Sequence, residues 1–272
     1  MLRRLSRNHL AVMGLIIALL VGLSALAAPW LAPAPPKQVN LGAYLAPPGP
    51  GHLLGADDLG RDILSRILYG ARLSLWIGLV GMAVALAIGV PIGLVAGFLG
   101  SLVDSFLMRF TDMVLAMPFI LLAIALAAAL GPSVTNSYIA LGLATWPYVA
   151  RIVRGQVLAV RELDFVQAAR ALGGNNLRIM LRHVLPNVLA PIMVFGTARL
   201  AQNILAESAL SFLGLGAQPP EPSWGAMLYA GRSFLRTAPW LSFFPGLAIF
   251  LTVLGFNLLG DGLRDALDVR LR

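Results

Sequence analysis

Cysteine is absent from this 272-residue chain, and lysine occurs once, at Lys37. The lack of cysteine excludes disulfides, thiolate chemistry and cysteine-bound metal. The single lysine is not preceded by the glycines of a Gly-x-x-x-x-Gly-Lys phosphate-binding loop. Any work driven by a nucleotide would therefore have to be done by another subunit.

Charge is also scarce: 12% of the residues are charged and 58% are hydrophobic. Soluble domains carry about 25% charged residues, so an apolar excess of this size indicates lipid rather than a larger core. The net charge of +8 is distributed over short segments between apolar runs. That distribution argues against nucleic acid as a partner and favours a membrane protein.

Groups of residues typical of catalytic or metal sites are missing as well. The three histidines lie in unrelated segments without metal-ligand spacing, and no Gly-x-Ser-x-Gly motif is present. A cluster of carboxylates is interpreted most simply as a solvated polar face; it comprises Asp57, Asp58 and Asp62. The sequence thus predicts no enzymatic activity, no catalytic residue and no metal site.

Long apolar runs predict an all-α integral membrane protein with about six transmembrane helices. The expected spans are residues 10–31, 72–99, 106–130, 137–153, 188–213 and 241–260. Ala25-Leu26-Ala27 resembles a signal-peptide cleavage site, but the length of the first run favours a retained span. Four prolines lie within or near spans, where they can kink a helix: Pro91, Pro118, Pro147 and Pro191.

The chain is expected to divide into three parts. Residues 1–71 form the N-terminal span and an extracytoplasmic segment, with a surface helix around Leu64 to Leu68. Residues 72–262 form a core with a cytoplasmic loop at about 154–187, and residues 263–272 form a cytoplasmic tail. With the N-terminus inside, the inner segments hold thirteen arginines, and the outer ones hold six lysines and arginines. The positive-inside rule therefore predicts cytoplasmic N- and C-termini.

Two helix stripes differ in character. Gly81, Ala85, Gly89, Gly93 and Gly97 recur every four residues, which favours close helix packing inside the chain, with a dimer contact as the alternative. Arg199, Asn203 and Glu207 recur at the same interval within an apolar run. Ionisable groups in a span face water or a partner, so this second stripe either lines a translocation path or ties two helices together.

The most polar stretch in the second half is "DFVQAARALGGNNLRIMLRHVLPN", residues 164–187. Asp164 and Gln167 are expected to form a capping box for a helix of about two turns, with Phe165, Ala168, Ala169 and Leu172 on one face. Gly173 and Gly174 supply a left-handed stop, and Asn175 or Asn176 caps a second helix that ends or kinks at Pro186. Because two turns are unstable alone in water, the short helix must pack on a partner protein or lie against lipid headgroups.

This stretch resembles the cytoplasmic signature loop of ABC importer permeases. In that pattern Glu-Ala-Ala is followed by a glycine and a downstream His-x-Leu-Pro; here Gln167 replaces the glutamate. The matching positions are Ala168, Ala169, Gly173, His183, Leu185 and Pro186. Three further segments look like the second-permease type of the dipeptide, oligopeptide and nickel group: "HLLGADDLGRDILSRILYGARLSL", "ESALSFLGLGAQPPEPSWGAML" and "FNLLGDGLRDALD".

The resemblance implies a type I importer permease in the inner (plasma) membrane. It would pair with a second, similar permease, with two ATPase subunits that hold ATP and Mg²⁺, and with an extracytoplasmic substrate-binding protein; the chain itself would hold no cofactor. In such systems the short helix of the loop docks in a groove of the ATPase. That role would fall to Asp164, Phe165, Gln167, Ala168, Ala169, Arg170, Gly173 and Gly174, with a structural role for His183, Leu185 and Pro186.

The expected function is the passage of di- or oligopeptides, or of a similar small solute, through the membrane. Nickel chelates and glutathione are alternatives within the same machinery. A stand-alone channel or secondary transporter is the alternative from another class, and it would leave the polar loop without a purpose.

Overall fold

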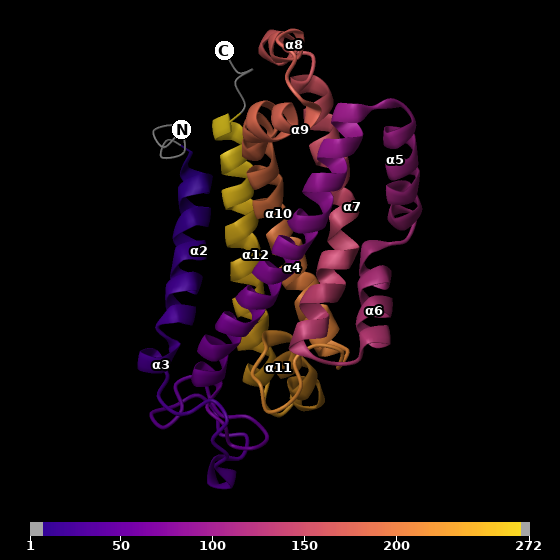
Figure 1. The fold of residues 1–272 in the computed structure, drawn as a ribbon. Helices are drawn as coiled ribbons and strands as arrows, with labels where there is room; N and C mark the ends of the chain where they lie inside the picture. Colours follow the sequence, from indigo (N-terminus) through magenta and orange to yellow (C-terminus); the bar gives the residue numbers. More distant parts are fainter. Residues whose placement is uncertain (1–7, 268–272) are drawn as a thin grey trace.

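Helices dominate residues 8–267, the part of the chain that the computed structural model describes (Figure 1). In chain order they are α2 (His9–Leu26), α3 (Ala28–Leu31), η1 (Leu41–Ala43), α4 (Ile63–Leu99), α5 (Ser101–Leu115), α6 (Phe119–Leu130), α7 (Val134–Val160), α8 (Asp164–Ala171), α9 (Asn176–Ile179), a π-helical turn η2 (Met180–Val184), α10 (Leu185–Phe212), α11 (Trp224–Gly231), η3 (Arg232–Phe234) and α12 (Trp240–Leu267).

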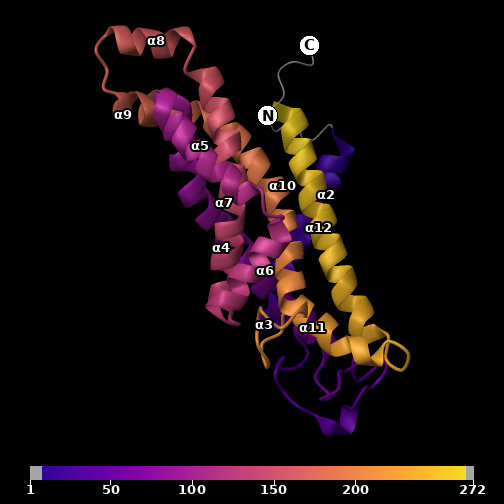
Figure 2. The same ribbon diagram turned by 90° about the vertical axis from the view of Figure 1, so that its right-hand side faces the viewer.

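The long helices run side by side in one elongated bundle (Figures 1 and 2). The helix α8 lies across one end of the bundle, called the α8 end below. The opposite end, the α11 end, is formed by α11 and by the irregular loop of residues 32–62. The α4–α7 pair makes the most extensive helix contact among the described residues, and α12 packs on both α2 and α10.

The all-helical membrane architecture is confirmed, but two of the six expected spans differ from the expectation. Within residues 8–267, four helices are long and apolar enough to cross a bilayer: α2, α4, the continuous segment Asn176–Phe212, and α12. The single span expected at 106–130 is instead the pair α5 and α6, bent by 85° at a break before Phe119; counted as one, the pair makes a fifth span. The expected span 137–153 lies in α7, which packs along α4 but is not among these apolar helices.

The start of α4 corrects the expectation for residues 64–68. No separate surface helix forms there, because α4 begins at Ile63 and continues for 37 residues. Asp62 caps this helix: its carboxylate accepts hydrogen bonds from the backbone N–H and the hydroxyl of Ser65, each at 2.8 Å. The expected divisions at 71/72 and 262/263 therefore fall inside α4 and α12.

The glycine stripe of α4 packs against α7 within the chain. A Cβ atom built on Gly93 would lie 2.4 Å from the carbonyl oxygen of Ala150, and one built on Gly89 would lie 2.6 Å from that of Trp146. Real Cβ atoms do not approach so closely, so the two backbones touch only because these side chains are absent. The expectation of internal packing is borne out by this contact.

The acidic cluster of the outer loop is not a solvated face, contrary to the expectation. Asp57, Asp62, Arg61 and Arg66 are all buried. Asp57 lies 2.7 Å from Nε of Arg61 and 3.5 Å from Nε of Arg66, and it also accepts the backbone N–H groups of Leu59 and Arg61. The loop of residues 32–62 is thus held in place by a buried ionic network.

Replacing Asp57 with asparagine tests this network. The change keeps the shape and an acceptor for the backbone, but it removes the charge that faces two buried guanidinium groups. We expect a loss of about 2 kcal/mol of stability, the range for hydrogen bonds to charged groups. Thermal unfolding in detergent measures it. Asp58→Asn is the control, because that side chain is more exposed and lies 3.7 Å from Arg61; equal melting of the two variants would contradict the network.

Candidate functional site: the loop between α7 and α10

The short helix α8 is attached to the bundle by one buried side chain. Val166 is fully buried and packs in a core cluster with residues of α4, α7 and α9. Ala169, one turn further along, packs against the same cluster. The sequence analysis did not identify Val166, although an apolar residue three positions before Ala169 is a sequence signal for a buried face.

The capping box expected for α8 is wrong in detail. Asp164 is the first helical residue rather than the cap, and Leu163 at the cap position makes no side-chain hydrogen bond. The Nε2 group of Gln167 instead donates to the carbonyl oxygen of Arg161, 3.0 Å away. Gln167 therefore holds the helix to the end of α7, and an amide can donate this bond whereas the carboxylate of the usual glutamate cannot.

The stop after α8 forms as expected. Gly173 has a φ of +77°, and its N–H donates to the carbonyl oxygen of Arg170, while the N–H of Gly174 donates to that of Ala169. These bonds close the end of the helix in the left-handed manner that favours glycine. Asn175 then caps α9 by accepting the N–H of Leu177 at 3.0 Å.

The second helix of the loop does not end at Pro186. The segment passes from α9 through the π-helical turn η2 into α10, so Pro186 occupies the first turn of a long helix. Pro186 has no N–H to donate to the preceding turn, and the wider π-helical turn η2 lies directly before α10. His183 and Leu185 are half-buried at this joint, and the carbonyl oxygen of His183 accepts a hydrogen bond from Asn187.

The outward face of the loop is apolar and unpaired within the described residues. Phe165 is 41% exposed and Leu172 is 89% exposed, and Ala168 lies on the exposed surface of α8. Arg170 stacks over the ring of Phe98 at 4.8 Å, and Arg161 donates to the carbonyl oxygen of Gly97 at 2.7 Å. The loop therefore offers a short amphipathic helix, with Phe165 and Ala168 among its exposed residues, on a base fixed to the ends of α4 and α7.

Two ion pairs that the sequence analysis missed join α5 to α7. Arg154 makes two bonds to Asp104, at 2.5 and 2.6 Å, and Arg151 pairs with Asp112. The residues are about 40 to 50 positions apart in the chain, so no local pattern reveals them. The pairs hold α5 against the helix that leads into α8.

The polar stripe of α10 faces the interior of the chain. Asn203 and Glu207 are fully buried; Asn203 accepts a hydrogen bond from Thr145 of α7, and Glu207 accepts one from Ser211. Arg199 stacks instead over Tyr148 and Phe119, at 3.9 and 4.7 Å. These contacts support a tie between helices, and a role in a translocation path stays a prediction.

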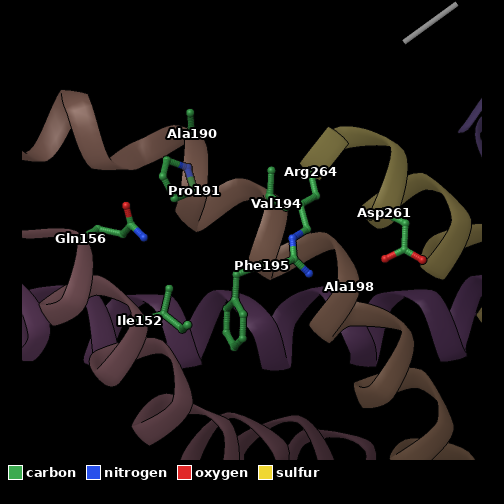
Figure 3. Close-up of a pocket in the computed structure, with 10 residues that line it drawn as sticks. Ile152, Gln156, Ala190, Pro191, Val194, Phe195, Ala198, Asp261 and Arg264 are labelled. Carbon is green, nitrogen blue, oxygen red and sulfur yellow. The ribbon is translucent and has the colours of Figure 1, made fainter. Parts of the chain in front are cut away.

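A cavity of about 720 Å³ opens between α7, α10 and α12 (Figure 3). It is lined by Ile152, Gln156, Ala190, Pro191, Val194, Phe195, Ala198, Gly260, Asp261 and Arg264. Most of its walls are apolar, and its two charged side chains both come from α12. No pattern in the sequence indicates this cavity, because its lining comes from three helices distant in the chain.

An all-helical membrane bundle with an exposed short helix after its fourth long segment is the architecture of an importer permease, and family comparison agrees. Residues 89–272 match the family described as binding-protein-dependent transport system inner membrane component, and residues 1–48 match the N-terminal transmembrane domain of oligopeptide transport permease C. The chain belongs to this family of multi-pass inner membrane proteins. It is a non-catalytic permease of an ABC transport system with ATPase partners, and it is of the second-permease type.

Its relatives include several transport proteins. The chain is 47% identical over 270 residues to the dipeptide transport system permease protein DppC of Alkalihalophilus pseudofirmus, covering 99% of this chain and 89% of that protein. A putative peptide transport system permease protein of Brucella abortus is also 47% identical, with 99% and 91% covered. The glutathione transport system permease protein GsiD of Shigella flexneri is 45% identical, with 99% and 89% covered.

One solved structure supports the fold. A chain of the MetNI methionine ABC transporter in an inward-facing conformation superposes with a TM-score of 0.61 at 18% identity, covering 74% of this chain and 95% of that one. At this level of identity the likeness concerns the fold alone. It confirms the importer permease fold that the sequence predicts.

Proposed function

We propose that this chain is the second permease of an importer for short peptides, including peptide-like solutes such as glutathione. Its relatives at 45–47% identity are named for dipeptide, peptide and glutathione transport, and each match extends over 99% of this chain. Nickel chelates are the weaker candidate because the relatives compared above are named for peptide, dipeptide and glutathione transport.

The loop around α8 is proposed as the docking element for an ATPase subunit. The observation that carries this proposal is the exposed apolar face of α8 on a base anchored by Val166 and Gln167. A helix of two turns is barely stable alone in water, and binding of its apolar face in a groove of a partner protein would stabilise it. The pairs between α5 and α7 would pass a displacement of α8 to the spans.

The α8 end is proposed to face the cytoplasm. Eight of the thirteen arginines assigned to the inner side lie in the described residues; Arg3, Arg4, Arg7, Arg270 and Arg272 lie outside them. The outer side is assigned only six lysines and arginines: Lys37, Arg61, Arg66, Arg72, Arg232 and Arg236. The positive-inside rule then orients the bundle.

The α11 end is proposed to meet an extracytoplasmic binding protein. Its loop of residues 32–62 is kept rigid by the network around Asp57, and Lys37 pairs with Glu221 to join this loop to the segment before α11. A second, similar permease completes the translocation path, and ATP and Mg²⁺ bind in the ATPase subunits. A pre-formed loop loses little conformational entropy when a partner docks.

Reconstitution tests the proposed function. Proteoliposomes that contain this chain, its partner permease, the ATPases and the binding protein should take up a labelled dipeptide only when ATP is supplied. Omission of any one component should reduce uptake to the background. Gradient-driven uptake by the purified chain alone would overturn the importer reading in favour of a secondary transporter.

A further inference from the structure

The cavity between α7, α10 and α12 exists because two helices touch at one level and separate toward the α8 end. A Cβ atom built on Gly260 would lie 3.2 Å from both Cα and Cβ of Ala198, which places α10 and α12 in direct contact there. Pro191 interrupts the hydrogen bonding of α10 one to two turns closer to the α8 end. The cavity opens along this diverging stretch, with Ile152 and Gln156 of α7 as its third wall (Figure 3).

The walls combine an apolar surface with one charge of each sign. Ile152, Val194 and Phe195 line one side, and Asp261 and Arg264 line the other. The two charged residues are exposed and lie one helical turn apart on α12, and neither takes part in a salt bridge within residues 8–267. The cavity therefore presents an acceptor for an ammonium group and a donor for a carboxylate beside an apolar wall.

We propose that this cavity binds a short zwitterionic peptide on its way to the α8 end: Asp261 contacts the terminal ammonium group, Arg264 contacts the terminal carboxylate, and Phe195 and its neighbours contact the side chains. This inference rests on the proposed import of peptides. A volume of about 720 Å³ lies within the range of roughly 300–1,000 Å³ found for small-molecule sites. Guanidinium groups bind carboxylates through two parallel hydrogen bonds, which makes the recognition specific.

A phospholipid headgroup offers similar chemistry, because phosphatidylethanolamine also carries an ammonium group and an anion. The proposed import of peptides favours a peptide as the occupant, because the apolar wall beside the two charges can then contact the peptide's side chains.

The test uses the assembled transporter in nanodiscs made of phosphatidylcholine and phosphatidylglycerol, without ATP. The probe is the dipeptide Ala-Phe, with its N-acetylated and its C-amidated forms for comparison. Asp261→Asn should weaken binding of the free dipeptide roughly tenfold and leave binding of the N-acetylated form unchanged. Arg264→Gln should weaken binding of the free dipeptide by a similar factor and leave that of the amidated form unchanged. Arg264→Lys should restore part of the affinity.

Two results would overturn the proposal. One is affinity equal to that of the wild type in both variants. The other is an equal loss for free and capped peptides, which would show a structural effect instead of recognition of the termini. A third result would assign the cavity to lipid and would also overturn the proposal. In that case added phosphatidylethanolamine displaces the dipeptide, and both variants bind the free and the capped peptides with the same affinity.

A photoreactive version of the dipeptide adds a positional readout. A benzophenone in place of the phenylalanine ring should crosslink to α10 near Phe195, and the adduct can be mapped by mass spectrometry. A wild-type complex that imports dipeptide with ATP but shows no adduct in α7, α10 or α12 refutes the cavity site alone. A wild-type complex that imports no peptide refutes the proposed function, and the peptide site with it.

Discussion

Replacement of Gly93 with leucine is expected to unfold the contact between α4 and α7. The first added carbon atom would lie 2.4 Å from the carbonyl oxygen of Ala150 and 2.7 Å from Cβ of Val153, and neither helix can give way without separating. Overpacking in a core costs 1–3 kcal/mol and sometimes more, so we expect about 3 kcal/mol or more here because backbone atoms are involved. A drop of the melting temperature on the order of 10 °C should follow.

The matched control is Gly155→Leu on α7. A Cβ atom at Gly155 has no atom within 4 Å, so the same side chain should fit there. Thermal unfolding in detergent compares the two variants. Because Gly93 packs inside the chain, the variant should lose the same stability in the isolated chain as in the assembled transporter. A loss of stability seen only in the assembled transporter would instead show that the glycine stripe is a dimer contact.

Changes in α8 are expected to uncouple the permease from its ATPase. Ala168→Asp places a charge on the exposed face of the helix, where the proposed groove would have to desolvate it. Gly173→Trp forces a bulky residue into a left-handed conformation at φ +77°, which displaces the end of the helix. We expect each variant to weaken ATPase binding on the order of 10- to 100-fold, with a matching loss of ATP-driven uptake.

Gly131→Trp is the matched control for the second variant. Gly131 has a φ of +87° and, like Gly173, no atom within 4 Å of an added Cβ, but it lies in the turn between α6 and α7 at the other end of the bundle. Pull-down of the ATPase by purified permease measures binding, and membrane insertion is checked by fractionation. Normal ATPase binding by Ala168→Asp and Gly173→Trp would count against the docking role.

Local patterns predicted the loop well where a single turn decides the geometry. The glycine stop at Gly173 and the cap at Asn175 form as expected, because each depends on backbone conformation within a few residues. The capping box failed, since the carbonyl oxygen of Arg161 competes for the side chain of Gln167. That acceptor belongs to the end of α7, and its position is set by how the helices pack.

Charge in the outer loop was misjudged for a similar reason. Asp57, Asp58 and Asp62 are close in sequence and are interpreted from it as a solvated polar face, yet Asp57 and Asp62 are buried, together with Arg61 and Arg66. Pro36 contributes an acceptor from 30 residues away, at 3.0 Å from Nη1 of Arg66. Burial of a charged side chain depends on partners that converge in space, so composition alone does not reveal it.

The sequence by itself determined that this protein spans a membrane, has no phosphate loop of its own and belongs to the importer permeases. Those properties follow from composition, from the length of apolar runs and from motifs read along the chain. Only the tertiary structure decided which way the stripe at Asn203 and Glu207 faces, what anchors α8, and that α10 and α12 separate around a cavity with one charge of each sign. These features depend on where helices distant in sequence touch and diverge, and helix contacts are set by packing of side chains that no local pattern contains.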